Sequence, residues 1–189
     1  MSNEPQGDEP PASVRAAIEA AIVELETVDP HAPLTDLDSL DSQVEDAPVV
    51  GLGEPSHGTR DVFRFKHRLF RYLVEEFDCR LFAIEANFSE TLSLNEYVTA
   101  GTGTAEELLM ESDLHGPWKC DAVLDLLEWI RSFNETYPDD QIRFHGFDMQ
   151  HNSKTAEMLA AYLEDVDADA LADVTDSLDE IESIHLEQP

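Results

Sequence analysis

Apolar side chains follow two patterns along this chain: short continuous runs, and recurrences at three- and four-residue steps. Continuous runs are typical of buried strands and occur at residues 48–53, 80–86 and 141–147. Recurrences are typical of amphipathic helices and occur at residues 13–28, 61–77, 89–99, 121–133 and from Ser153 onward. Thr104 and Glu107 predict a capping box that opens another helix. Strands alternating with helices predict an α/β protein with a parallel sheet flanked by helices.

Composition divides the chain into four predicted segments. These are a disordered acidic tail (1–11), an N-terminal helical segment (12–47), an α/β core (48–154) and an acidic amphipathic helical segment (155–189). Because three strands are few for a complete sheet of this class, we expect an incomplete architecture, or a minimal one that needs a partner.

The last predicted segment combines an apolar helical face with a strongly acidic one. Residues 155–189 contain eleven carboxylates and neither Lys nor Arg, while apolar residues recur at three- and four-residue steps. This pattern fits an ordinary packing helix or helix pair. It also fits a helix whose apolar face binds another chain, either in a homodimer or as a complementing second half of the fold.

Charge is the dominant feature of the composition. Among 189 residues, 11 Lys and Arg stand against 42 Asp and Glu, giving a net charge of −31. Such a chain lacks the cationic side chains that release counterions from nucleic acid, and an anionic membrane surface would repel it. Because 42% of the residues are hydrophobic, a folded core is expected. Few lysines and many carboxylates favour a halophilic protein in a salt-loaded cytoplasm over an ordinary acidic protein with an interaction tail.

Targeting and membrane signals are not seen in the pattern. The first eleven residues are polar and acidic, and no apolar run approaches the roughly 20 residues that span a bilayer. Cys79 and Cys120 lack the spacing of metal ligands, so reduced, partly buried thiols are expected. These features predict a cytoplasmic protein.

Chemistry-bearing residues follow the predicted strands, at the sheet edge where parallel α/β proteins bind ligands. Glu54 and His57 follow the first run, Glu85 ends the second, and Asp148 ends the third. A neutral His57 could take a proton from water while Glu54 or Glu85 fixes its tautomer. This arrangement predicts hydrolysis by an activated water.

Two other mechanisms use the same residues. Glu54 and His57, together with His145, Asp148 and His151, could supply metal ligands, although their spacing is not that of a helical H-E-x-x-H motif. Ser56 could act as a nucleophile, but the G-x-S-x-G arrangement of a serine hydrolase is absent.

Lys66 lies within the apolar stripe of the helix predicted at 61–77, so it points toward the sheet. Either its stem packs while its amine reaches water, or its cation lies near the His57 loop and binds a substrate oxygen. Six basic residues gather at positions 60–80, Arg60 among them. They either pair with neighbouring carboxylates or steer an anionic substrate. Lys66, Arg60 and Asp148 are the candidates for binding substrate.

Several of these segments resemble the erythromycin esterase-like family. The resemblance rests on VGLGEPSHGTR at 50–60 and FKHRLF at 65–70, and continues through AIEA at 83–86, LNEYV at 94–98, Trp118, LEWIRSFN at 127–134 and GFDMQ at 146–150. It implies an α/β fold with a helical lobe and hydrolysis of carboxylic esters or lactones by attack of water, without an obligatory metal or other cofactor.

The same resemblance implies roles for individual residues. His57 matches the catalytic base, Glu54 and Glu85 match acidic site residues, and Lys66 matches a basic one. Members of the family are about twice as long, and their second half supplies further histidines. The resemblance therefore implies an esterase-type hydrolase acting on a small ester or lactone when completed by a partner or second half. An inactive fragment or interaction module is the alternative.

Overall fold

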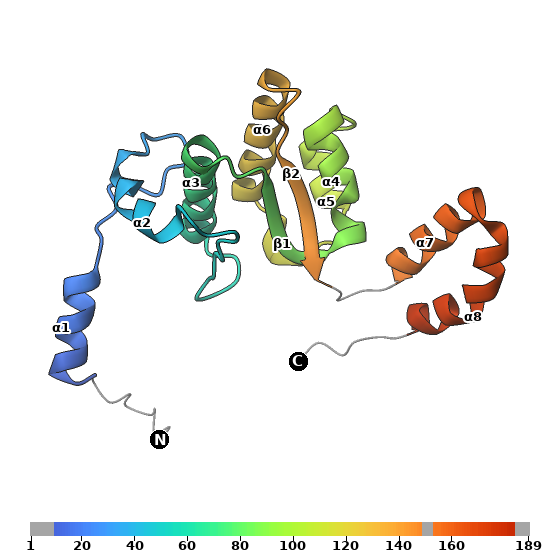
Figure 1. Ribbon diagram of the computed structural model, residues 1–189, viewed down its shortest axis with the longest axis horizontal. Coiled ribbons are helices and arrows are strands. Elements are labelled where there is room, and N and C mark those ends of the chain that lie inside the picture. Colours follow the sequence, from blue (N-terminus) through green and yellow to red (C-terminus); the bar gives the residue numbers. More distant parts are fainter. Residues whose placement is uncertain (1–9, 149–152, 184–189) are drawn as a thin grey trace.

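The computed structural model describes residues 10–148 and 153–183. Its sheet consists of two parallel strands, β1 (Leu81–Asn87) and β2 (Arg143–Asp148), which pair from Leu81 opposite Arg143 to Ile84 opposite Gly146 (Figure 1). Together with the surrounding helices they confirm the α/β class and the two strands predicted at 80–86 and 141–147.

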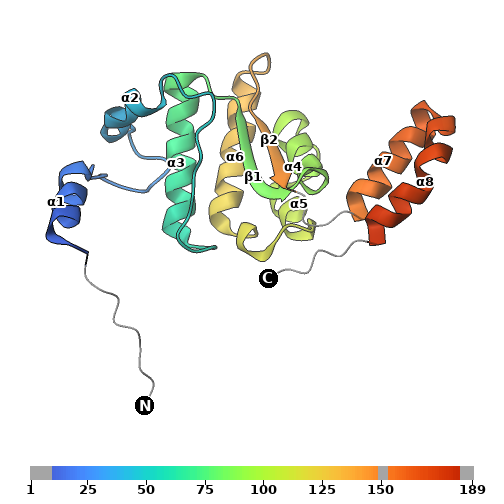
Figure 2. The same cartoon turned by 60° about the horizontal axis from the view of Figure 1, so that its bottom comes forward.

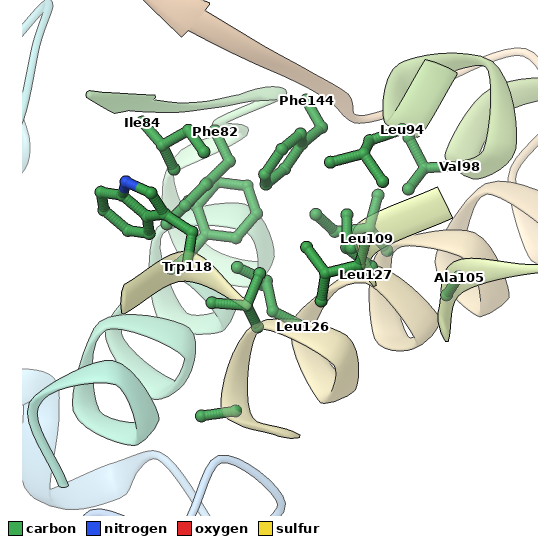
Figure 3. Close-up of a cluster of buried hydrophobic side chains, with 14 of the residues drawn as sticks. Phe82, Ile84, Leu94, Val98, Ala105, Leu109, Trp118, Leu126, Leu127 and Phe144 are labelled. Atoms are coloured by element: carbon green, nitrogen blue, oxygen red, sulfur yellow. The ribbon is translucent and has the colours of Figure 1, made fainter. Parts of the chain in front are cut away.

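Helices cover one face of this sheet. They are α3 (Arg60–Phe77), α4 (Phe88–Ala100), α5 (Ala105–Glu111) and α6 (Asp121–Thr136) (Figures 1 and 2). Side chains alternate along β1, so that Phe82, Ile84 and Ala86 are buried while the residues between them are exposed. Figure 3 shows Phe82, Ile84 and Phe144 of the strands facing leucines of α4, α5 and α6 across a continuous apolar core.

The prediction of a strand at residues 48–53 is wrong. This segment has no regular secondary structure and pairs with neither strand of the described sheet. Val49 is 83% exposed, whereas Leu52 packs against the core. A strand forms only where a neighbouring strand accepts and donates its backbone hydrogen bonds, and an apolar run cannot report whether that neighbour is present.

The N-terminal segment contains α1 (Ala12–Ala21), a 3-10 helix η1 (Thr35–Leu40) and the short helix α2 (Asp41–Val44). The helix predicted at 13–28 is therefore shorter than expected, and none of its residues is buried. The rest of the segment is bound to α3 through the side chain of Arg68. Arg68 is fully buried, binds Asp36 through both guanidinium ends, and also donates to the carbonyl of Thr27 at 3.0 Å.

The C-terminal segment forms a helical hairpin of α7 (Ser153–Val166) and α8 (Ala168–Ser183) (Figure 2). Ser89 of α4 and Thr155 of α7 are hydrogen bonded at 2.8 Å. The two helices pack on each other but leave apolar side chains in solvent, among them Met158, Leu159, Tyr162, Val166 and Ile181. The boundaries predicted for the four segments stay predictions, and residues 1–9, 149–152 and 184–189 lie outside the described part of the chain.

The structure also bears on the two cysteines and on membrane-spanning helices. Cys79 and Cys120 are half-buried free thiols, as predicted. Among the helices described, none combines the length and apolarity needed to cross a membrane.

Candidate active site

The candidate site begins in the loop that leads into α3. Gly58 has a φ of +76°, a conformation that glycine adopts without the clash a Cβ would cause. Thr59 follows as the N-cap residue, and its carbonyl accepts from the amides of Val62 and Phe63 at 3.1 Å. The turn at Gly58 and the helix start at Arg60 together place the loop beside the first turns of α3.

Glu54 joins His57 to Lys66. Its Oε1 lies 2.5 Å from Nδ1 of His57, and its Oε2 lies 2.7 Å from Nζ of Lys66. Glu54 and Lys66 are about nine-tenths buried, at 10% and 9% side-chain exposure, whereas His57 is 63% exposed. The three residues therefore form a line that runs from a buried cation through a buried carboxylate to an accessible imidazole.

The environment keeps Glu54 ionised. Desolvation by burial raises its pKa, but the hydrogen bonds from Lys66 and His57 outweigh burial, so the pKa of Glu54 lies below its ordinary value. An ionised carboxylate can only accept, so the proton of the short bond sits on Nδ1 of His57. The neutral imidazole then carries its lone pair on Nε2, the nitrogen that would act as a base.

Two aromatic rings lie close to the Lys66 ammonium. Nζ lies 5.4 Å from the ring centroid of Phe63 and 5.8 Å from that of Trp118, and those two rings meet edge to face at 5.3 Å. A small apolar cavity adjoins these residues and reaches Phe82 and Phe144. Of the two interpretations of Lys66, the structure excludes a wet amine, because the amine is buried and paired with Glu54.

Three other predicted site residues lie on three different elements of the described structure. Glu85 projects from the exposed face of β1 and has no hydrogen bond or ion pair with His57, Glu54 or Lys66. Arg60 is exposed at the first position of α3. Asp148 is half-buried at the end of β2, in register with Asn87. Roles for Glu85, Arg60 and Asp148 stay predictions.

The metal alternative depends on residues that the described structure does not gather. Within residues 10–148 and 153–183, no three His, Cys, Asp or Glu side chains form a group that could hold a metal ion. His151, one of the ligands of that alternative, lies outside the described residues.

Trp118 is the site residue that sequence reasoning missed. No role in the site is predicted for it from the sequence, yet the Lys66 ammonium lies over its ring. Trp118 comes from the 3-10 helix η2 (Gly116–Trp118), more than fifty residues beyond Lys66 in the chain, so no local spacing links the two. Phe63 lies three residues before Lys66 on α3, so helical spacing alone could predict that its ring lies near the Lys66 side chain.

Comparisons with known proteins agree on one family. The family model described as erythromycin esterase matches residues 74–189, which is more than half of the chain. This chain belongs to the erythromycin esterase family. The matched region includes Glu85 and Trp118 but begins after Glu54, His57 and Lys66.

Three individual proteins are similar to the chain. The erythromycin esterase type II of Escherichia coli is 27% identical over 138 residues, which are 71% of this chain and 32% of that protein. A Bacillus cereus protein of known crystal structure is 30% identical, with a TM-score of 0.74, over 89% of this chain and 40% of its own. A mutant of erythromycin esterase EreC in its open conformation has the same fold, with 24% identity and a TM-score of 0.63, over 83% of this chain and 38% of its own. The chain thus spans about a third of the length of the curated relative and about two-fifths of the two solved chains.

Proposed function

We propose that this chain is a hydrolase of carboxylic ester or lactone bonds, in which His57 activates a water molecule. The observation that carries the proposal is the Glu54 bridge between an accessible His57 and a buried Lys66. Family membership supports it, since one relative is named an erythromycin esterase. A small uncharged or weakly charged ester suits so acidic a chain better than a polyanion, which a net charge of −31 would repel.

In the proposed reaction, Nε2 of His57 takes a proton from water as the water oxygen attacks the carbonyl carbon. The imidazolium that forms keeps its Nδ1 proton directed at Glu54, whose negative charge stabilises it. Collapse of the tetrahedral intermediate breaks the bond to the alcohol oxygen, which receives the proton back from Nε2. The products are a carboxylic acid and an alcohol, and His57 returns to its neutral form.

Lys66 has an indirect part in this proposal. Its ammonium fixes the second oxygen of Glu54, which prevents the carboxylate from rotating away from His57. Arg60 and Asp148 are proposed to contact substrate at the sheet edge, and Glu85 is proposed to act as a further acidic residue of the site. No metal or organic cofactor has a part in these steps.

A second candidate is a non-catalytic fragment or interaction module of the same fold. The observation in its favour is that the chain spans only 32–40% of the E. coli and B. cereus relatives. In this case the exposed apolar residues of α7 and α8 would serve an interaction with a second copy or with a complementing half. For either candidate, we propose a salt-loaded cytoplasm as the compartment, on the strength of the −31 charge.

Hydrolysis of an activated ester and of a macrolide lactone by the full chain, in low and high salt, tests the proposal. His57→Ala should abolish hydrolysis of both substrates and leave the circular dichroism unchanged, because the side chain is largely in solvent. Ser56→Ala should hydrolyse both at the wild-type rate, because water and not a serine is the nucleophile.

The outcomes separate the alternatives. Equal activity of wild type and His57→Ala would remove His57 as the base. Loss of activity in Ser56→Ala, with a burst of the first product in wild type, would point to a covalent serine mechanism. A folded wild-type chain that hydrolyses neither substrate would favour the non-catalytic candidate.

A further inference from the structure

Trp118 lies at the buried end of the line that Lys66, Glu54 and His57 form. The centroid of its ring is 5.8 Å from Nζ of Lys66, and only 8% of Trp118 is exposed. The ring of Phe63 lies 5.4 Å from the same nitrogen and meets the Trp118 ring edge to face, with 62° between the ring planes. Two aromatic rings and one carboxylate therefore border the ammonium.

The Lys66 ammonium has three N–H donors. Among the residues that the structure describes, Nζ donates one hydrogen bond, to Oε2 of Glu54 at 2.7 Å. Burial of a cation costs free energy unless other groups replace the water that it loses. The negative face of an aromatic ring attracts a cation within about 6 Å of its centroid, and tryptophan attracts it most strongly. Phe63 and Trp118 therefore take the place of water beside the buried ammonium.

The 3-10 helix η2, which carries Trp118, also lies beside the loop of His57. A Cβ on Gly58 would lie 3.9 Å from Cβ of Pro117, so the turn of that loop and η2 are in ordinary contact. Lys119 follows η2, and its ammonium donates at 3.0 and 2.5 Å to two carbonyls at the C-terminal end of α5. These contacts on both sides of η2 fix the position of the Trp118 ring.

We propose that Trp118 is a positioning residue of the candidate active site: the attraction of its ring for the Lys66 ammonium keeps that cation on Glu54 and thereby fixes the orientation of the His57 ring. The effect passes through the two hydrogen bonds that Glu54 accepts, from Lys66 and from His57. Without the aromatic face, the ammonium would turn toward water and the carboxylate could rotate away from Nδ1. The consequence for catalysis rests on the proposed function, whereas the effect on the His57 ring does not.

Packing alone is the alternative role for Trp118. The residue belongs to the apolar core, where Phe82 and Ile84 lie near it (Figure 3). Any smaller side chain would lower stability, so a loss of stability does not distinguish the two roles. Fluorination of the indole weakens its negative face and hardly changes its shape. A chain with tetrafluorotryptophan at position 118, introduced by amber suppression, therefore keeps the packing and loses most of the attraction for the cation. It should fold even where Trp118→Leu does not.

Nitrogen-15 NMR of the histidine rings measures the orientation of His57 without any substrate. At about pH 9 an ordinary histidine is neutral, and the shifts of Nδ1 and Nε2 show which nitrogen carries the proton. A hydrogen bond to the Glu54 carboxylate places that proton on Nδ1, whereas an imidazole free in water favours Nε2. The signals of His57 are identified by their loss in His57→Ala.

The comparison includes wild type, the fluorinated chain, Trp118→Leu and Trp118→Phe. Trp129→Leu is the matched control, because it removes the other indole of the chain, which packs on His67 and Phe70. In wild type, Trp118→Phe and Trp129→Leu, the His57 proton should lie mainly on Nδ1. In the fluorinated chain and in Trp118→Leu, a larger fraction should lie on Nε2.

Hydrolysis of an activated ester by the same chains measures the catalytic consequence. The fluorinated chain and Trp118→Leu should have a kcat about tenfold below wild type and a KM within about twofold of it, because the ring acts on the base and not on substrate binding. A chain without ester hydrolysis in wild type would remove the proposed function alone, since the NMR comparison decides the role of Trp118 without substrate.

Three results would overturn the proposal. The first is a fluorinated chain with the tautomer and the kcat of wild type, which would leave Trp118 a packing role. The second is an equal change of the tautomer in Trp129→Leu, which would indicate general loosening of the core. The third is a wild-type His57 with its proton mainly on Nε2, because no ordered bond to Glu54 would then exist for Trp118 to maintain.

Discussion

Nζ of Lys66 lies 2.7 Å from Oε2 of Glu54, and only about a tenth of either side chain reaches solvent. A buried ion pair contributes little net stability, because desolvation offsets the attraction between the charges. Its geometry is nevertheless sensitive to the loss of one partner, since the other charge is then buried without compensation. The pair therefore fixes the Glu54 carboxylate in one orientation, and through it the ring of His57.

The first prediction concerns this pair. Lys66→Met should lower the free energy of unfolding by about 3 kcal/mol at neutral pH, because Glu54 stays buried without its cation. The double variant Lys66→Met with Glu54→Gln should recover most of that loss, because no buried charge remains. Urea denaturation at pH 7 measures both. A double variant no more stable than Lys66→Met would show that the loss came from packing and not from charge.

Acid should act on the same pair in a defined direction. The pKa of Glu54 is lowered in the folded chain, so ionised Glu54 contributes stability above its ordinary pKa near 4.5, and that contribution is lost as the pH falls through the folded value. As the pH is lowered from about 5 to the point where the chain unfolds in acid, the double variant should therefore lose less stability than wild type.

The second prediction concerns His67, which is 1% exposed and has no hydrogen bond to either ring nitrogen. Burial lowers the pKa of His67 from 6.5 to about 4, although Asp125, 3.6 Å from Nδ1, acts in the opposite direction. Between these pH values the unfolded chain binds a proton that the folded chain does not. Stability should thus fall as the pH is lowered from about 6.5 to 4, by about 3 kcal/mol in total.

His67→Phe should remove that part of the pH dependence. The ring keeps its contact with Trp129, which lies at 5.5 Å, and no unpartnered nitrogen remains in the core. Urea midpoints measured at half-unit steps from pH 7 to about pH 4 should give a flatter profile for the variant than for wild type. Parallel profiles would show that another group is responsible for the acid sensitivity.

The third prediction compares two arginines of α3. Arg68 is fully buried and binds Asp36, whereas Arg64 is 30% exposed and pairs at 3.0 Å with Asp29, itself 47% exposed. Arg68→Met should cost about 3 kcal/mol, because Asp36 would lose its buried partner. Arg64→Met should cost less than about 1 kcal/mol, as is usual for an ion pair in contact with solvent. Urea denaturation of both variants measures the difference.

Loss of the Arg68 bond should also release the N-terminal segment. Arg68 donates hydrogen bonds to the carbonyl of Thr27 and to the carboxylate of Asp36. The hydrogen bond to Asp36 lowers the pKa of that carboxyl from 3.8 to about 2. Limited proteolysis should therefore cut Arg68→Met within residues 22–40 at a pH where wild type resists. Equal resistance of Arg68→Met and Arg64→Met would contradict this account.

How far the sequence predicts this structure depends on whether a feature is local. The helices and the strands β1 and β2 follow from side-chain periodicity, which the chain carries within each segment. The segment 48–53 has the same apolar character as those strands, but its pairing depends on a neighbour that its own residues do not specify. Its strand was accordingly predicted and is not formed.

The candidate active site divides in the same way. Glu54 and His57 are three residues apart, and Lys66 follows on the next helix, so their proximity could be expected from the loop and from the helical stripe. The approach of Trp118 to Lys66 depends on how η2 packs against α3, which no spacing encodes. Glu85 lies at a predicted strand end, but strand alternation directs it to the exposed face of β1.

The fourth prediction concerns salt. Because the net charge is −31, the carboxylates on the surface repel one another. The described part of the α7–α8 hairpin carries many carboxylates and a single basic residue, Lys154. Since 1 M salt shortens the screening length to about 3 Å, KCl should raise the melting temperature, by about 2–4 °C for each kcal/mol of repulsion relieved. Sucrose at equal osmolality is the control for excluded-solute effects. An equal rise in both solutions would remove charge screening as the cause.

The fifth prediction concerns Gly146 of β2, which lies against the backbone of β1. A Cβ at this position would lie 2.2 Å from the carbonyl oxygen of Ala86 and 2.6 Å from that of Asn87, well inside contact distance. The strand cannot easily shift away, because the Gly146 amide donates to Oγ1 of Thr91 at 2.7 Å. Gly146→Ala should therefore separate β1 from β2 locally and cost about 3 kcal/mol.

Gly116→Ala is the matched control, because no atom outside its chain neighbours lies within 4 Å of the added methyl group. It should leave the urea midpoint unchanged, or raise it slightly by restricting the unfolded chain. Hydrogen exchange should be faster in Gly146→Ala than in wild type at the amides that pair β1 with β2, and unchanged in α8, far from the clash. A Gly146→Ala chain as stable as Gly116→Ala would mean that the strands have room for a methyl group, and that their spacing does not require glycine.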